Sequence, residues 1–475
     1  MNNIREKEYQ LVPLPWDIES EIKVGNYDTA RKMIAYRLAT PHVPSTIKKR
    51  LEIELEMLDH DELMFIIDEK KALKMVQKVI KDFTAEDLQD LVIRGRIDYE
   101  YINGKRMYHR EFLDALFRTR PDFVHKTDKY VAAKKADDKK ALEAFDDPFK
   151  VLSDVSENAK EGDILKAHIH MDHILHLDPK KDVLGQKTRI HMPLPWKDNP
   201  WISNLKINSI TPDPMHISRP ASTHHTAYFE TTAKKQDFRL EYEYDFTQEV
   251  VDLYNADPYE YDFEAPDDII EQYTREEWPA IAFTPFMQLL AEEIVGDETN
   301  PLLKARLIYD YITNTCTYRF VRDYASVPNI SEYNAINGKG DCGFNAILFI
   351  TLCRIVGVPA KWESGHYPRP NAISNHDWCM IYVEGLGWRH VDPSVGNIMK
   401  IHGLEKSRQF YFGNVDPYRC PCNTGICEEF DPPKNYSRYD PTDSQDGEVE
   451  FETRGSYLFQ DFTYERNNLG IRLIK

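Results

Sequence analysis

One cysteine stands where a buried helix is expected to begin. In INGKGDCGFNAILFITLCRIVGVP (residues 336–359), a glycine-rich turn leads into a nearly all-apolar run that starts at Cys342 and stops before Gly357 and Pro359. A side chain in the first helical turn faces unpaired backbone N–H groups and the positive end of the helix dipole. Both effects lower the pKa of a thiol, so we expect Cys342 to be a reactive nucleophile. Cys353, further along among apolar residues, is expected to be an inert core side chain.

An imidazole and a carboxylate follow on two predicted antiparallel strands. The run SNHDWCMIYV alternates, with His376 and Trp378 on one face. After a glycine turn, GWRHVDPS places His390 and Asp392 together on one face of the return strand. His376 and Asp392 are not level in this register, so a bulge or a diagonal contact has to bring them together. His390 competes as the base, but we expect it to line the site.

A thiolate, an imidazole and a carboxylate can form a nucleophilic triad. In this reading Cys342 attacks a carbonyl carbon, and its backbone N–H donates to the oxyanion. His376 holds the thiolate as an ion pair and then protonates the leaving group. Asp392 fixes the histidine tautomer and stabilises the imidazolium.

These pieces together resemble the core of the transglutaminase-like superfamily, which is related to papain-like cysteine proteases. The resemblance rests on a helix-starting Cys, LCR-x-x-G-V-PA, a His-x-Trp strand and GW-x-x-x-DPS, in that order over residues 300–400. The runs TYRFVRDY, YFGNVDPYR and DPTDSQDGEVEFE are similar to longer bacterial members. The resemblance implies that Cys342 is the nucleophile, His376 the general acid/base and Asp392 the orienting carboxylate. It also implies that a side chain upstream of the cysteine donates a hydrogen bond to the oxyanion, and Tyr318 is the candidate.

The remaining chain supplies the elements around this core. Apolar residues at helical spacing predict a helical N-terminal region, with a capping box at Thr84 and a hairpin turn at Asn103-Gly104. Five alternating runs between residues 164 and 246 predict a β-sandwich-like module, and Pro301 to Thr315 reads as an amphipathic helix.

We therefore expect an α+β protein with a papain-like transglutaminase core, a preceding β-sandwich-like module and a helical N-terminal region. The predicted parts are a helical region (1–160), the β-sandwich-like module (161–255), the catalytic core (256–415) and a C-terminal extension packing on the core (416–475). Trp378 and Trp388 are expected to form the pocket wall.

The amino-acid composition excludes some classes of partner and favours one cellular compartment. The 475 residues carry 60 Lys plus Arg and 79 Asp plus Glu, a net charge of −19. This argues against nucleic acid or an anionic membrane as the partner. No apolar run of about 20 residues is present to span a bilayer, and the first residues lack the apolar centre of a secretory signal. The seven cysteines, an odd number, lie between Cys316 and Cys427, which favours a reducing cytoplasm over a disulfide framework.

Three further patterns invite a metal interpretation. His168, His170, His173 and His176 follow one another in HIHMDHILHL, but no nearby cluster completes a metal-binding set. Cys420, Cys422 and Cys427 could hold zinc with a fourth ligand, although zinc sites normally show CxxC pairs. The acidic stretch 257–268 lacks the spacing of a calcium-binding loop. We expect no cofactor and no resident metal, and we leave the role of the three cysteines open.

The expected activity is a cysteine-dependent amide-bond hydrolase or acyltransferase that passes through a thioester, with peptide hydrolysis ahead. Alternatives are a protein-glutamine transamidase, a peptide N-glycanase-like amidase and a non-catalytic scaffold. The N-glycanase type usually carries a CxxC pair upstream of the nucleophile, and none occurs here. The expected partner is a protein or peptide substrate, and the helical N-terminal region is a candidate surface for a protein partner.

Overall fold

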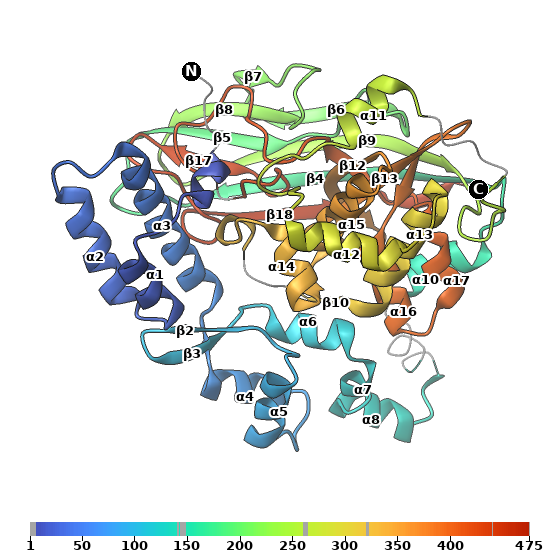
Figure 1. Cartoon of the computed structure of the whole chain (residues 1–475), viewed down its shortest axis with the longest axis horizontal. Helices are drawn as coiled ribbons and strands as arrows, with labels where there is room; N and C mark the ends of the chain where they lie inside the picture. Colours follow the sequence, from blue (N-terminus) through green and yellow to red (C-terminus); the bar gives the residue numbers. More distant parts are fainter. Residues whose placement is uncertain are drawn as a thin grey trace.

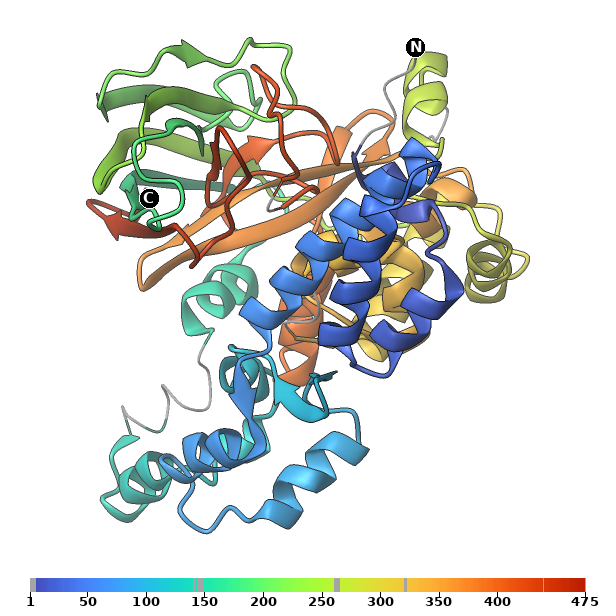
Figure 2. The same cartoon turned by 90° about the vertical axis from the view of Figure 1, so that its left-hand side faces the viewer.

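The described part of the chain folds into three larger β-sheets with helices packed around them (Figures 1 and 2). The computed structural model describes residues 6–139, 142, 149–259, 265–319, 323–438 and 440–474. The α+β class, the sandwich-like module and the helical N-terminal region are confirmed. Among the described residues, no helix is both long enough and apolar enough to cross a bilayer.

The N-terminal region consists of helices, the longest of which has 20 residues, with a small three-stranded sheet between them. Thr84 and Asp87 form the predicted capping box, and Asn103 and Gly104 make the hairpin turn with φ of 47° and 80°. The predicted linker 126–147 contains one described helix, and residues 140–141 and 143–148 lie outside the described part. The elements are η1 (Glu6–Leu11), α1 (Trp16–Lys23), α2 (Tyr27–Ala39), α3 (Ser45–Met64), β1 (Ile67–Asp68), α4 (Glu69–Gln77), α5 (Ala85–Ile93), β2 (Tyr99–Ile102), β3 (Lys105–Tyr108), α6 (Phe112–Thr119), α7 (Pro121–Val124), α8 (Asp128–Lys135) and α10 (Lys150–Asn158).

The sandwich buries the apolar faces of two antiparallel sheets against each other. One sheet has the order β18-β4-β9-β6, with β19 also on β4, and the other has the order β17-β5-β8-β7. Met171 and Leu240 from the first sheet share one core with Ile190 and Phe229 from the second. The strands are β4 (Ile164–Leu177), β5 (Lys187–Pro193), β6 (Ile202–Thr211), β7 (His216–Ile217), β8 (Thr226–Thr232), β9 (Gln236–Glu249), β17 (Glu448–Phe451), β18 (Phe462–Asn468) and β19 (Arg472–Ile474). The end of the chain therefore completes both sheets.

The predicted catalytic core places one buried helix against a five-stranded sheet of order β15-β14-β13-β12-β16. Every residue of α15 from Gly343 to Arg354 is buried, as its apolar sequence predicts. The elements are α11 (Asp267–Tyr273), α12 (Pro285–Val295), α13 (Pro301–Thr315), β10 (Thr317–Tyr318), η2 (Tyr324–Ser326), α14 (Ile330–Asn337), β11 (Lys339–Gly340), α15 (Cys342–Ile355), β12 (Ala360–Arg369), β13 (Ala372–Val383), β14 (Gly387–Val391), α16 (Pro393–Ile401), α17 (Glu405–Phe410), β15 (Phe412–Gly413) and β16 (Cys420–Asn423).

Ionic contacts hold the N-terminal region against this core. His60 on α3 lies 2.8 Å from the Asp323 carboxylate, and both side chains are largely buried. Asp98 pairs with Arg319 at 3.2 Å and also with Lys339. Because Lys339 directly precedes the turn into α15, these contacts place the helical region beside the start of that helix. Figure 2 shows α1 to α3 alongside the catalytic helices.

Candidate active site

His376 and Asp392 meet through a diagonal contact across two strands. Cys379 on β13 pairs with Val391 on β14, so Asp392 lies one residue beyond the ladder. The Nε2 atom of His376 is 2.7 Å from Oδ2 of Asp392, and both side chains are buried. The Tyr367 ring stacks on the imidazole with centroids 4.8 Å apart, which fixes the plane of His376. The expected histidine–carboxylate pairing is therefore present in the structure.

A buried arginine holds the carboxylate from behind. Arg419, immediately before β16, donates from Nη1 to Asp392 at 2.8 Å and from Nη2 to Asp416 at 2.7 Å, and it is 0% exposed. Burial alone would raise the pKa of Asp392, but attraction to His376 and Arg419 outweighs it and brings the pKa to about 2. Sequence reasoning missed Arg419, although YFGNVDPYR, which contains it, is one of the runs that carry the resemblance.

The imidazole is neutral near pH 7. Burial lowers the pKa of His376 below its ordinary value, and the Asp392 carboxylate opposes this only in part. A neutral imidazole oriented through Nε2 keeps its Nδ1 atom available as a proton acceptor. His376 can therefore act as a general base.

The Cys342 thiol lies at the start of α15, next to two carboxyl groups. Asp341 caps the helix, accepting from the Phe344 N–H at 3.4 Å, and also accepts from the Tyr324 hydroxyl at 2.5 Å. Asp377, the neighbour of His376, accepts a hydrogen bond from the thiol. Burial raises the pKa of Asp377 to about 7 and that of Asp341 to about 6.

These surroundings correct the expectation of a low thiol pKa. Burial raises the pKa of Cys342 well above its ordinary value, and the negative charges of Asp377 and Asp341 raise it further. Burial and the two carboxyl groups act against the partial positive charge of the helix terminus. The resting group is a neutral thiol, so its activation requires a base.

Asp377→Asn is expected to increase the reactivity of Cys342. Removing the charge that opposes thiolate formation lowers the thiol pKa, and each unit of pKa is worth about tenfold in thiolate fraction. Because Asp377 titrates at about 7, the ratio of variant to wild-type alkylation rates is expected to rise above pH 7 and approach one below it. The measurement is the pH dependence of alkylation by iodoacetamide.

Glu111→Gln is the matched control for that experiment, since Glu111 lines the same cavity and does not contact the thiol. Equal rates for Asp377→Asn and wild type at pH 8 would show that Asp377 does not govern the thiol.

Cys342 and His376 line two adjacent cavities. The larger, of about 370 Å³, has Cys342 and Asp377 in its wall, and the smaller, of about 30 Å³, has His376. Arg118 and Tyr318 line both. Within the described part of the chain, no hydrogen bond joins the Cys342 thiol to His376. Cys342, His376 and Asp392 thus line or adjoin neighbouring cavities. The contact between His376 and Asp392 is made, and the contact between the Cys342 thiol and His376 is not.

The larger cavity is strongly acidic, and distant segments build it. Seven acidic side chains line it, against one arginine, Arg118, and His109, whose pKa burial lowers to about 4. The helical N-terminal region supplies His109, Arg118 and two of the carboxyl groups. The seven acidic residues are Glu111, Asp114, Asp323, Asp341, Asp377, Asp440 and Asp446.

The other expected site residues lie as follows. Tyr318 is 4% exposed and lines both cavities, so it is placed within the site. Neither Trp378 nor Trp388 is among the residues that line these two cavities. Trp378 donates to Glu363 at 2.7 Å beside the imidazole, and Trp388 packs on Tyr382. His390 is outside both cavities.

The histidine-rich strand β4 forms cross-strand hydrogen bonds between histidines and carboxylates. His168 lies 2.9 Å from Asp245, and His176 lies 2.8 Å from Asp237, with both carboxylates on β9. His173 points into the core, where its ring packs edge-on against His366 with centroids 5.2 Å apart. Of the acidic stretch 257–268, residues 260–264 lie outside the described part.

Comparisons with known proteins agree with this geometry. A family model described as the transglutaminase-like superfamily matches residues 288–393, which include Cys342, His376 and Asp392. No curated protein matches the sequence.

Several solved structures are similar in part. A candidate cysteine protease from Cytophaga hutchinsonii is 17% identical, with 65% of this chain and 92% of that chain covered and a TM-score of 0.43. The periplasmic domain of TgpA from Pseudomonas aeruginosa is 12% identical, with 54% and 96% covered and a TM-score of 0.28. A candidate protease from Parabacteroides distasonis is 10% identical, with 49% and 44% covered and a TM-score of 0.21.

Proposed function

Because residues 288–393 form a domain of the transglutaminase-like superfamily, we propose that this chain is a cysteine-dependent hydrolase or acyltransferase acting on amide bonds. The observation that carries the proposal is the position of Cys342. It begins a buried helix in the wall of a cavity, beside the buried His376–Asp392 pair. A non-catalytic scaffold would have no need of a carboxylate held by a buried arginine behind an oriented histidine.

The proposed reaction has two acyl-transfer steps. The Cys342 thiol gives its proton to Nδ1 of His376 as its sulfur attacks the substrate carbonyl carbon. The carbon–nitrogen bond then breaks, the imidazolium gives that proton to the departing amine, and a thioester remains. Water or an amine attacks the thioester with His376 again as base, and the thiol is regenerated.

Two surrounding residues stabilise the charges that form during the reaction, one the imidazolium of His376 and the other the oxyanion of the substrate. Asp392 stays ionised at neutral pH and stabilises the imidazolium. Tyr318 is proposed to donate to the oxyanion. Since no hydrogen bond joins thiol and imidazole in the resting structure, substrate binding has to bring them into contact, as often occurs between resting and substrate-bound enzymes.

The acidic cavity favours positively charged groups on the substrate. Carboxylates concentrated in a low-dielectric cleft attract cations and repel acidic peptides. The peptidase form of the proposal therefore predicts cleavage next to basic residues or a free amino terminus. The same feature favours a second candidate, transamidation, because an acceptor amine arrives as a cation and Asp377, with a pKa of about 7, can take its proton.

A quenched-peptide library, assayed with and without a primary amine, separates these activities. We expect basic peptides to be turned over at least about tenfold faster than acidic ones, the equivalent of about 1.4 kcal/mol of differential binding. Hydrolysis in the absence of amine supports the peptidase form, and amine incorporation without cleavage supports the transamidase form. Cys342→Ala serves as the blank.

A glycopeptide added to the same library covers the N-glycanase alternative, which would release the glycan and leave the peptide bond intact. If neither peptides, amines nor glycopeptides are processed and no thioester can be trapped, the catalytic proposal is wrong.

We also propose a cytoplasmic location and a protein or peptide substrate. Dependence on a reduced thiol supports the location, and no disulfide links the seven cysteines, all of which the structure describes. The N-terminal region contributes to the cavity wall, so any protein that it binds would lie next to the substrate.

A further inference from the structure

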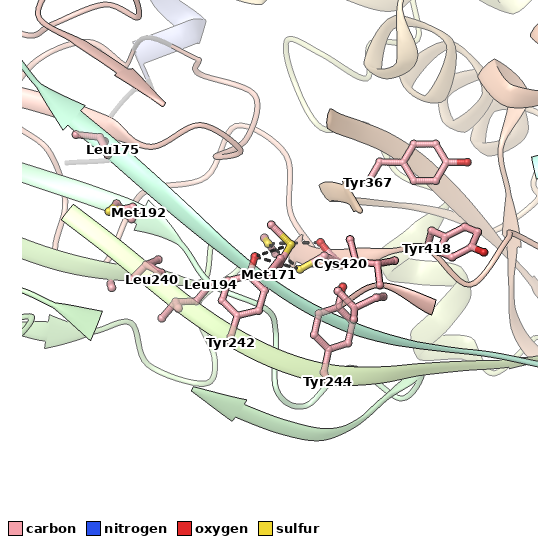
Figure 3. Packing of buried hydrophobic residues seen from close by; sticks show 14 of the residues in the cluster. Met171, Leu175, Met192, Leu194, Leu240, Tyr242, Tyr244, Tyr367, Tyr418 and Cys420 are labelled. Carbon is pink, nitrogen blue, oxygen red and sulfur yellow. Dashed lines mark hydrogen bonds between the residues drawn. The ribbon is translucent and has the colours of Figure 1, made fainter. Parts of the chain in front are cut away.

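A second group of reactive side chains lies buried behind the catalytic sheet. One ligand atom from each of His366, Cys420 and Cys422 lies within 4.8 Å of the others, and all three side chains are buried. It is the only such group among the described residues. Figure 3 shows Cys420 facing Tyr242 and Met171 of the sandwich. Nothing in the proposed reaction uses these side chains.

The spacing of these atoms fits a tetrahedral metal ion. The two sulfur atoms are 3.9 Å apart, and thiolates bound at about 2.3 Å to a tetrahedral zinc lie about 3.8 Å apart. The Tyr242 hydroxyl is 3.8 Å from the Cys420 sulfur and 3.0 Å from Nδ1 of His366. These three separations are close to three of the six edges of a tetrahedron that has the tyrosine oxygen at its fourth corner.

The histidine carries the support that a metal ligand needs. Its Nε2 atom lies 2.9 Å from the backbone carbonyl oxygen of Gln445, so Nε2–H donates there and the lone pair of Nδ1 is left for the side of the ring that faces the Tyr242 hydroxyl, 3.0 Å away. Metal-binding histidines usually donate their second ring N–H to a carbonyl or carboxylate in this way. The cluster also packs closely, because a Cβ on Gly365 would lie 3.1 Å from the Cys422 sulfur.

We propose that His366, Cys420 and Cys422, with Tyr242 in the fourth position, bind one Zn²⁺ ion. Two thiolates and a neutral imidazole balance the charge of the ion, which suits a site without solvent. Two soft sulfur donors with one nitrogen and one oxygen favour zinc over the hard cations that prefer oxygen alone. Cys427 is outside the cluster. Sequence spacing suggested Cys420, Cys422 and Cys427 with a further ligand such as Cys379 or a histidine, and it could not identify His366.

The ion would fasten the catalytic sheet to the sandwich. His366 lies on β12, the two cysteines lie on β16, and Tyr242 lies on β9 of the sandwich. Cys420 directly follows Arg419, the residue that holds Asp392. The site would therefore fix the backbone from which the catalytic carboxylate is oriented.

Metal analysis of the full chain tests this. After expression in zinc-supplemented medium, we expect about one zinc per wild-type chain, released only on denaturation with a chelator. Cys420→Ala and Cys422→Ala should lose the zinc, and Cys427→Ser should keep it as the matched control. Co²⁺ introduced during refolding should give a thiolate-to-cobalt charge-transfer band that Cys427→Ser retains.

Two results would overturn the proposal. One is folded wild-type protein that contains no zinc and gains no thiolate–cobalt band. The other is a Cys420–Cys422 disulfide in the freshly purified protein, detected by mass spectrometry, which would make the pair a redox site. Both use the wild type, so they decide the question even if the alanine variants fail to fold. Neither depends on catalysis, so the zinc site and the proposed activity stand or fall separately.

Discussion

Cys342→Ala is expected to lower the rate of amide-bond turnover by at least about a thousandfold, as loss of a triad nucleophile generally does. No other thiol could replace it as the nucleophile, because Cys342 is the one described cysteine that lines either cavity at the site. The fold should be unaffected, since the side chain lies in the cavity wall at the first position of α15 and is not part of the apolar core cluster. The measurement is turnover of a basic quenched peptide, together with trapping of the thioester.

Cys353→Ala is the matched control, because this cysteine lies in the same helix and is 0% exposed. It should leave turnover per folded molecule unchanged. His376→Ala should match the loss seen with Cys342→Ala, since the raised pKa of the thiol leaves it neutral without a base. Turnover of Cys342→Ala within about tenfold of the wild type would rule out the covalent mechanism.

Arg419→Met is expected to reduce the free energy of unfolding by about 3–5 kcal/mol, the usual cost of removing one partner from a buried ion pair. The guanidinium is 0% exposed and binds two buried carboxylates, Asp392 and Asp416. A methionine side chain is nearly as long as that of arginine but carries no charge, so both carboxylates lose the guanidinium as a counterion. Urea unfolding followed by circular dichroism measures the change.

The pH dependence of this loss has a definite sign. Asp392 has an ordinary pKa of 3.8 and a folded pKa of about 2, so its ionisation stabilises the fold above pH 4 and ceases to do so as pH falls toward 2. The difference between wild type and Arg419→Met should therefore be largest at neutral pH and become smaller below pH 4.

Arg408→Met provides the comparison for this variant. Arg408 is also buried, but its partners Asp310 and Glu405 are 31% and 47% exposed and remain solvated. Its replacement should therefore cost less than that of Arg419. An Arg419→Met variant as stable as Arg408→Met would mean that the Asp392–Arg419–Asp416 network is not a major source of stability.

Local sequence signals predicted the parts of the site that depend on neighbours in the chain. An apolar run after a glycine-rich turn placed Cys342 at a helix start, and strand alternation placed His376 diagonally to Asp392. The same kind of signal predicted the capping box and the five sandwich strands. Each of these follows from backbone geometry within about 20 residues, where spacing is informative.

Contacts between distant segments could not be predicted in this way. The helical region that supplies Arg118 is separated from Cys342 by more than 200 residues, and β18 returns to pair with β4 from the far end of the chain. Alternation shows that a strand has a buried face but does not identify its neighbour. The expected low pKa of Cys342 was wrong for a similar reason, because the pKa is raised first by burial and then by Asp377, which lies on β13 and not on the helix of the cysteine.

The late position of β17 and β18 has a consequence for how the protein is made. Until these strands are synthesised, β4 and β5 each lack a partner along one edge, and unpaired edges promote aggregation. Because long-range strand pairing is slow and chains fold as they emerge from the ribosome, the two sheets of the sandwich can be completed only after β17 and β18 have emerged. Gln445 and Asp446, next to β17, contact the catalytic strand β13. The surroundings of Cys342 are therefore complete only after β17 has been synthesised, so a chain that stops before β17 would lack the contacts that Gln445 and Asp446 make with β13.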